Sequence, residues 1–284
     1  MPFARVGIRL SPSPQSMGPV EASKRLASQL FPDRFVDWLS ANNHVDKRFG
    51  HVYRYHSRSD AHSIALCREI LADILAACPL LRRQAAAGRV GYHINAKITS
   101  PLTGKTKTLD LAIGLPVAGV TLVLGPGEAI ARAEIGELLF SCEAKTVMTE
   151  HSKSKPRVYD ELSSSHEIIH QGWPKAIATG ITVVNIADTF VSPLRQTSKR
   201  KLHVTRHRQP QAAEGMVRHL RGLPVREKSG TVGFEAYATV VVECDNTRRD
   251  VRLWREPPAP QPGDKDHHEN FISRIARFYS ERFA

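Results

Sequence analysis

The sequence lacks a hydrophobic run that could cross a membrane. Its most apolar stretch of suitable length, residues 64–81, is interrupted by three charged side chains, which are costly in the centre of a bilayer. The first twenty residues also lack the apolar core of a signal peptide and instead include Ser-Pro-Ser-Pro at 11–14. These absences predict a soluble, cytoplasmic protein with no membrane partner.

Cysteine is scarce in this chain. No two cysteines form the CxxC pair that is typical of zinc sites and redox motifs, and three lie in apolar, helix-like or strand-like surroundings. This pattern favours reduced, buried thiols over a disulfide framework or a metal cluster. The four residues are Cys67, Cys78, Cys142 and Cys244.

Acidic residues are outnumbered by basic ones. The chain has 28 Asp and Glu against 40 Lys and Arg, which gives a net charge of +12. Such a surplus attracts polyanions, and nucleic acid is the obvious candidate partner. Net charge indicates partners only statistically, so a basic protein without a nucleic-acid partner is the alternative.

Length and composition predict one elaborated domain of mixed α/β class. A chain of 284 residues with 41% hydrophobic and 24% charged residues can bury a substantial core. We expect an N-terminal helical segment at 1–59 and a core at 60–195. A basic arm, a strand and a C-terminal helix at 196–284 should complete the same domain.

Hydrophobic periodicity predicts the order of helices and strands. Between residues 20 and 42 the helical rhythm is interrupted by Pro32, which indicates two short helices. Downstream we expect helices at 60–77 and 157–171, a hairpin over 89–114 ending near Asp110, strands at 138–145, 176–187 and 237–244, a loop or arm at 193–212, and a final helix containing Phe271, Ile275 and Phe278.

Two carboxylates and a lysine occur on neighbouring predicted strands. Asp110 closes the hairpin, while Glu143 and Lys145 are two residues apart on the next strand and therefore share one face. Magnesium prefers hard oxygen ligands, and phosphodiester hydrolysis needs an activated water. Glu-Ala-Lys is the only acidic-x-Lys triplet in the chain, and it closes an apolar β-like run rather than lying on an exposed helix. We therefore predict a magnesium site here.

These residues and their context resemble the PD-(D/E)XK nuclease superfamily, to which most type II restriction endonucleases belong. The resemblance covers residues 60–193, although no proline precedes Asp110. It implies a mixed central sheet flanked by helices, a Mg²⁺-dependent endonuclease acting on double-stranded DNA, and a homodimer. It also implies that Asp110, Glu143 and the backbone carbonyl of Ala144 hold the metal, while Lys145 positions the attacking water and stabilises the phosphate.

Two basic segments are candidates for DNA contact, because Arg and Lys bind both phosphates and guanine. Solvated loops are the alternative for each segment. Glu69 is a candidate accessory acid, with an ordinary exposed helix residue as the alternative. The candidate DNA-binding residues are Lys153, Lys155 and Arg157 after the site strand, and Lys199, Arg200, Lys201, Arg206 and Arg208 in the arm.

A competing motif begins at His166. Together with Glu167 and His170 it matches HExxH, the zinc-protease signature, and it falls in a predicted helix that would place both imidazoles on one face. Against a zinc metalloprotease, the helix should end at Gly172 and no third histidine follows at the usual spacing. Two histidines at the surface are the simpler interpretation. A third alternative is a non-catalytic DNA-binding protein.

Overall fold

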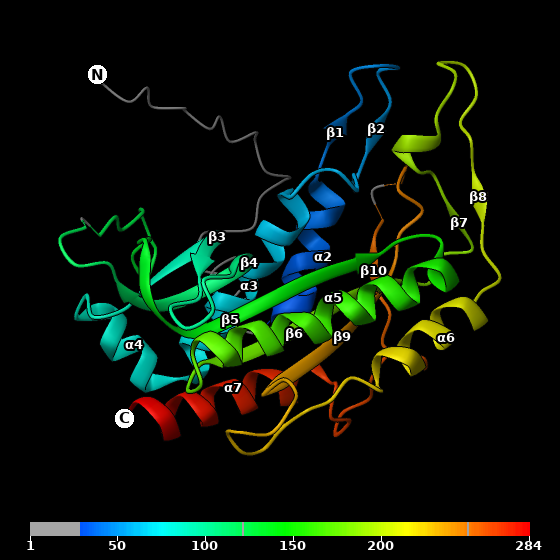
Figure 1. Cartoon of the computed structure of the whole chain (residues 1–284). Helices are drawn as coiled ribbons and strands as arrows, with labels where there is room; N and C mark the ends of the chain where they lie inside the picture. The colour runs from blue at the N-terminus through cyan, green and yellow to red at the C-terminus, as the bar shows by residue number, and fades with distance from the viewer. Residues whose placement is uncertain (1–28, 121, 249) are drawn as a thin grey trace. The chain divides into compact units, whose positions relative to one another are not determined.

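The computed structural model describes residues 29–120, 122–248 and 250–284 (Figure 1). The sequence predicted two short helices between residues 20 and 42. The first of them falls largely on residues 20–28, which are not among the described residues. Residues 31–284 form one compact unit. Its centre is a six-stranded mixed sheet flanked by helices, which confirms the α/β class.

The central sheet has the strand order β10-β9-β6-β5-β4-β3. The pairs β3/β4, β4/β5 and β9/β10 are antiparallel, whereas β5/β6 and β6/β9 are parallel. Each parallel pair needs a long crossover between its strands, and such crossovers usually contain a helix. The strands are β3 (Gly91–Thr99), β4 (Thr106–Pro116), β5 (Ile135–Val147), β6 (Ile177–Asn185), β9 (Ala236–Glu243) and β10 (Arg252–Leu253).

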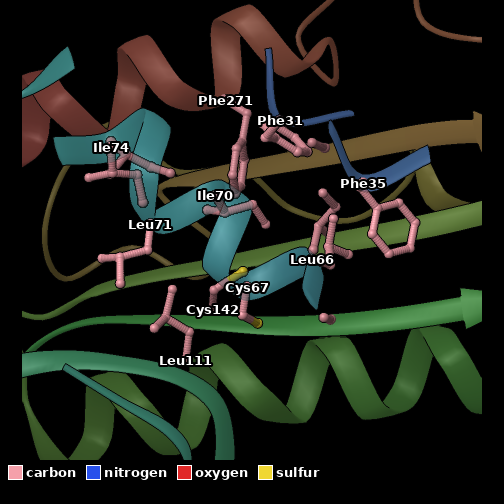
Figure 2. Packing of buried hydrophobic residues seen from close by; sticks show 14 of the residues in the cluster. Phe31, Phe35, Leu66, Cys67, Ile70, Leu71, Ile74, Leu111, Cys142 and Phe271 are labelled. Atoms are coloured by element: carbon pink, nitrogen blue, oxygen red, sulfur yellow. The ribbon is translucent and has the colours of Figure 1, made fainter. Parts of the chain in front are cut away.

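Helices cover both faces of this sheet. On one face, α3 packs between the strands and α7, and its apolar side chains meet Leu111 and Cys142 below and Phe271 above (Figure 2). The other face is covered by α5 and α6, which share a second apolar cluster with the sheet. The helices are α2 (Phe31–Ala41), α3 (Ala61–Ala77), α4 (Pro79–Ala86), α5 (His151–Gly172), α6 (Gln211–Leu220) and α7 (His268–Phe283).

Two short β-structures lie outside the central sheet. One is a hairpin of β1 (His44–Val45) and β2 (Val52–Tyr53). The other pairs β7 (Thr189–Phe190) with β8 (Thr205–Arg206), with the 3₁₀ turn η1 (Pro193–Arg195) between them. Figure 1 shows both projecting from the same side of the unit.

The structure corrects several sequence predictions. Asp110 lies in the middle of β4 rather than at its end, because the strand continues to Pro116. Helix α5 begins at His151, so the expected loop before residue 157 is helical and Pro156 lies inside the helix. Helices α4 and α6 were not predicted. Proline is tolerated in the first turn of a helix, so Pro79 begins α4 instead of ending the helical region.

Burial of the cysteines agrees with the sequence prediction. All four are buried free thiols, and all belong to the apolar cluster that α3 and α7 share with the sheet. Among the residues that the structure describes, we found no helix with the length and apolar character needed to span a bilayer.

Candidate active site

The candidate site lies where β4 and β5 separate. Their antiparallel register runs as far as Leu111 opposite Cys142. One residue further, Asp110 and Glu143 occupy facing positions on the two strands, as the sequence predicted for neighbouring strands. The Ala144 N–H donates a 2.7 Å hydrogen bond to Oδ2 of Asp110. The Asp110 side chain thus binds the β5 backbone at the point where the strand ladder opens.

Strand β3 is irregular at the same level. Its register with β4 passes from Ile94 opposite Leu111 to Ala96 opposite Leu109. Between them, Asn95 adopts a left-handed φ of 56°, which asparagine tolerates better than most residues. Such local irregularities are common beside functional sites, because they redirect side chains.

Glu143 is a buried carboxylate with two cationic neighbours. Its Oε1 accepts a 2.7 Å hydrogen bond from Nζ of Lys145, and Nζ of Lys107 lies 3.7 Å from Oε2. The Ser165 hydroxyl on α5 donates to Oε2 over 3.4 Å. A buried charge is costly without such partners. The pairing of Glu143 with Lys145 agrees with the prediction that they share one face of the strand.

Helix α5 adds a third carboxylate that sequence reasoning missed. Oε2 of Glu161 lies 3.2 Å from Nζ of Lys145, and its Oε1 accepts a 2.9 Å hydrogen bond from Arg157. No local sequence pattern marks Glu161, because it reaches the site only through the packing of α5 on β5. Lys145 therefore lies between Glu143 and Glu161.

Burial and mutual repulsion perturb the protonation of this group. The pKa of Asp110 is raised to about 6 by burial and by the charge of Glu143, against the opposing effects of the Ala144 hydrogen bond and of Lys145. Burial lowers the pKa of Lys145, but the carboxylates of Glu143, Asp110 and Glu161 outweigh this effect and raise it. Lys145 is therefore a cation at neutral pH and donates protons to hydrogen bonds.

A pocket of about 340 Å³ opens beside these residues. Asp110, Lys145 and Glu161 line it, together with residues of α3, the start of α5 and the segments that carry β2 and β7. Its uncharged wall contains Tyr55 and His62, which both hydrogen-bond the Thr146 hydroxyl, over 2.8 and 3.3 Å. Burial lowers the pKa of His62 to about 4, so its imidazole is neutral at pH 7.

The oxygens at this site suit a hard divalent cation. Within the described ranges, no group of three His, Cys, Asp or Glu side chains is arranged to hold a metal ion. Magnesium needs fewer protein ligands, since it commonly keeps several waters and binds one or two carboxylates. Asp110 and Glu143 supply these. In an extended strand the N–H and C=O of one residue point to the same edge, so the Ala144 carbonyl faces the opening as its N–H does.

The cations predicted to bind DNA are dispersed around the pocket. On α5, Arg157 lines it, Lys153 pairs with Glu150 over 2.9 Å, and Lys155 lies beside Gly215 of α6 in a separate hollow. Glu69 forms a 2.6 Å ion pair with Arg34 of α2 and does not line the pocket. The five arm cations, all exposed, are Lys199, Arg200, Lys201, Arg206 and Arg208.

The HExxH histidines lie on α5 but are not at the surface. His166 is buried against the ring of Phe234, 4.9 Å away between centroids, and burial lowers its pKa to about 4. Nε2 of His170 lies 3.2 Å from the carboxylate of Glu235. That carboxylate is fully buried and also binds Arg226 over 2.6 Å. The interpretation as two surface histidines is therefore wrong for His166, and His170 belongs to an ion-pair network.

Comparisons with protein-family models, with curated proteins and with solved structures found no match to this chain. Assignment of a function therefore depends on the chemistry of the site itself.

Proposed function

We propose that this protein is a magnesium-dependent DNA endonuclease. Its active site, formed by Asp110, Glu143 and Lys145, would hydrolyse phosphodiester bonds. The observation that carries the proposal is the meeting of two acidic residues and a cationic lysine where β4 and β5 separate, beside an open pocket. The net charge of +12 supports a polyanionic substrate. A sequence-specific enzyme of the type II restriction class is the form we favour.

The sheet topology supports a core like that of the PD-(D/E)XK nucleases. A helix, three consecutive antiparallel strands, a helix and a parallel strand follow one another as α3, β3, β4, β5, α5 and β6, with the short α4 inserted after α3. The basic C-terminal elaboration and a homodimer belong to the same proposal, since cutting both strands of a twofold-symmetric site requires two active sites.

Each residue of the site has a distinct role in this proposal. Asp110, Glu143 and the Ala144 carbonyl would hold Mg²⁺, which when bound polarises the phosphate and lowers the pKa of a coordinated water. The raised pKa of Asp110 supports this fit, because a cation between two repelling carboxylates favours their ionised forms. The Lys145 ammonium orients the attacking water and stabilises negative charge on the phosphate oxygens.

The geometry favours this function over a zinc protease. A catalytic zinc needs three protein ligands and an open position. His170 is engaged by Glu235, and His166 is buried against Phe234. A DNA-binding protein without catalysis is also disfavoured, because carboxylates near a phosphate-binding surface repel DNA unless a metal neutralises them.

Lys145→Ala is the first test of this proposal. We expect the single-turnover rate of magnesium-dependent cleavage to fall by about 10²–10³-fold, because one charge-stabilising donor is lost. Lys265→Ala is the control: Lys265 is an exposed lysine just before α7 and does not line the pocket. The control should cleave as the wild type does. Equal rates for Lys145→Ala and the wild type would contradict the role given to Lys145.

The raised pKa of Asp110 predicts a pH-dependent stability. Its ordinary pKa is 3.8 and its folded pKa about 6, so the stability that the protonated side chain contributes is present below pH 3.8 and lost as pH rises through 6. Without metal, Asp110→Asn should therefore be more stable than the wild type at pH 8, by at least about 1 kcal/mol, and equally stable near pH 4.

Thermal unfolding in EDTA measures this difference. Asparagine can still accept the hydrogen bond from Ala144, so the variant removes the charge and keeps the contact. Magnesium should stabilise the wild type more than the variant. Asp37→Asn, at an exposed position of α2, is the control. Equal stabilities of wild type and Asp110→Asn at pH 8 would show that the ionised Asp110 side chain does not destabilise the fold.

A further inference from the structure

Nine of the chain's twelve net positive charges lie in two projecting segments. We define arm 1 as residues 43–59, which contain β1 and β2, and arm 2 as residues 189–209, which contain β7 and β8. Arm 1 has four Lys or Arg and one Asp, and arm 2 has six Lys or Arg and no acidic residue. The charge that attracts polyanions is therefore concentrated in the arms rather than spread over the surface.

Most of these cations face solvent. In arm 2, Arg195 binds Glu150, and in arm 1 Arg54 is buried. The Asp46 carboxylate of arm 1 accepts hydrogen bonds from the backbone N–H groups of Arg48 and Phe49 within its own turn. The eight exposed cations are Lys47, Arg48, Arg58, Lys199, Arg200, Lys201, Arg206 and Arg208.

Hydrogen bonds join the two arms at their bases and again farther from the central sheet. Asn246, which is fully buried with a left-handed φ of 74°, binds both bases. Its side chain exchanges two hydrogen bonds with the backbone of Tyr55 and donates a third, 2.8 Å long, to the carbonyl of Val191. Further out, Nε2 of His51 donates to the carbonyl of Ser198 over 3.0 Å. The arms thus form one continuous structure.

This structure borders the candidate active site. Ser57 of arm 1 and Ser192 and Pro193 of arm 2 line the pocket that contains Asp110 and Lys145. A polyanion bound along the arms would therefore pass the mouth of the pocket. Figure 1 shows the two arms extending side by side away from the end of β5.

We infer that the two arms together form a clamp for the backbone of double-stranded DNA and hold the duplex at the pocket. Exposed Lys and Arg are the residues that bind duplex phosphates. Single-stranded DNA is bound mainly on exposed aromatic rings. The exposed large hydrophobic side chains of the arms are valine and leucine, and the ring of Phe49 is covered by the Arg48 guanidinium at 4.8 Å.

The test is the salt dependence of DNA binding in EDTA, measured by fluorescence anisotropy with a labelled duplex. One variant removes cations from arm 1, Lys47→Ala/Arg48→Ala, and another from arm 2, Lys199→Ala/Arg200→Ala/Lys201→Ala. The control, Arg82→Ala/Arg83→Ala/Arg89→Ala, removes three exposed cations in and after α4. Each lost phosphate contact should lower the slope of log K against log salt concentration by about 0.9.

Both arm variants should bind the duplex at least about tenfold more weakly than the control and with a reduced slope. If either arm variant matches the control in affinity and slope, the clamp is refuted. Tighter binding of the same sequence as a single strand than as a duplex would also refute it. Thermal unfolding of each variant checks that the fold is retained.

The clamp rests on the proposed function, but the experiments can refute either proposal without refuting the other. Magnesium-dependent cleavage that survives with normal affinity in both arm variants would leave the nuclease standing and remove the clamp. Weakened duplex binding in both arm variants, with no cleavage by the wild type under any condition, would support the clamp and remove the nuclease.

Discussion

Asp110→Ala protein is expected to cleave DNA at least about 10³-fold more slowly than the wild type at saturating magnesium. Asp110 supplies one of the two carboxylates nearest the point where β4 and β5 separate, and its Oδ2 accepts a hydrogen bond from the Ala144 backbone N–H. The substitution removes a proposed metal ligand and the hydrogen bond that Asp110 accepts from β5. Glu143→Gln should lose activity on the same scale, because it removes the second carboxylate and the negative charge paired with Lys145.

Binding of DNA separates this effect from unfolding. In EDTA, Asp110→Ala protein should bind duplex DNA as tightly as the wild type or more tightly, because a negative charge near the phosphate is gone. Asp37→Ala, which changes an exposed aspartate of α2, should leave both cleavage and binding unaltered. Cleavage by Asp110→Ala at the wild-type rate would mean that the active site lies elsewhere.

The second large effect is expected at Glu235, which contributes to the stability of the fold rather than to catalysis. Its carboxylate is fully buried and binds Arg226 over 2.6 Å, Arg282 over 2.8 Å and His170 over 3.2 Å. Glu235→Gln keeps the shape but leaves the Arg226 guanidinium, only 2% exposed, without its countercharge. We expect a loss of about 3–5 kcal/mol in the free energy of unfolding, measured by denaturant titration at pH 7.

Glu227→Gln is the matched control for this prediction. Glu227 also pairs with two arginines, Arg274 and Arg277, but it is 59% exposed, so its removal should cost less than about 1 kcal/mol. Although burial opposes it, His170 and the two arginines lower the pKa of Glu235 to about 2. The stability from Glu235 should therefore persist above pH 4.5 and be lost toward pH 2. Equal losses in the two variants would contradict the buried network.

The regular elements could be predicted because their periodicity is local. Alternation along residues 138–145 predicted the centre of β5, and the apolar face of residues 60–77 predicted α3. Helix α6 has the same kind of signal in Ala213, Met216, Val217 and Leu220, but the polar stretch before it and Gly215 within it hid the pattern. Helix α4 was missed because a proline ends one helix and begins the next equally well.

Only the part of the site that follows from the geometry of a single strand could be predicted. Glu143 and Lys145 share a face by the two-residue period of a strand. That Asp110 faces them required β4 and β5 to pair, which sequence periodicity does not specify. Glu161, Tyr55 and His62 come from α5 and from segments before β3, and only tertiary packing brings them to the pocket. The proposed clamp also depends on tertiary contacts, because Asn246 joins its two arms through Tyr55 and Val191.

The most direct test of the active site is cleavage of plasmid and phage DNA by the purified full chain, with magnesium or with EDTA. Wild-type protein should give discrete fragments in magnesium and none in EDTA, and Asp110→Asn and Lys145→Ala proteins should give none on the same time scale. DNA that stays intact with magnesium, or that is cut equally well by Asp110→Asn protein, would contradict the assignment of Asp110, Glu143 and Lys145 as a nuclease site.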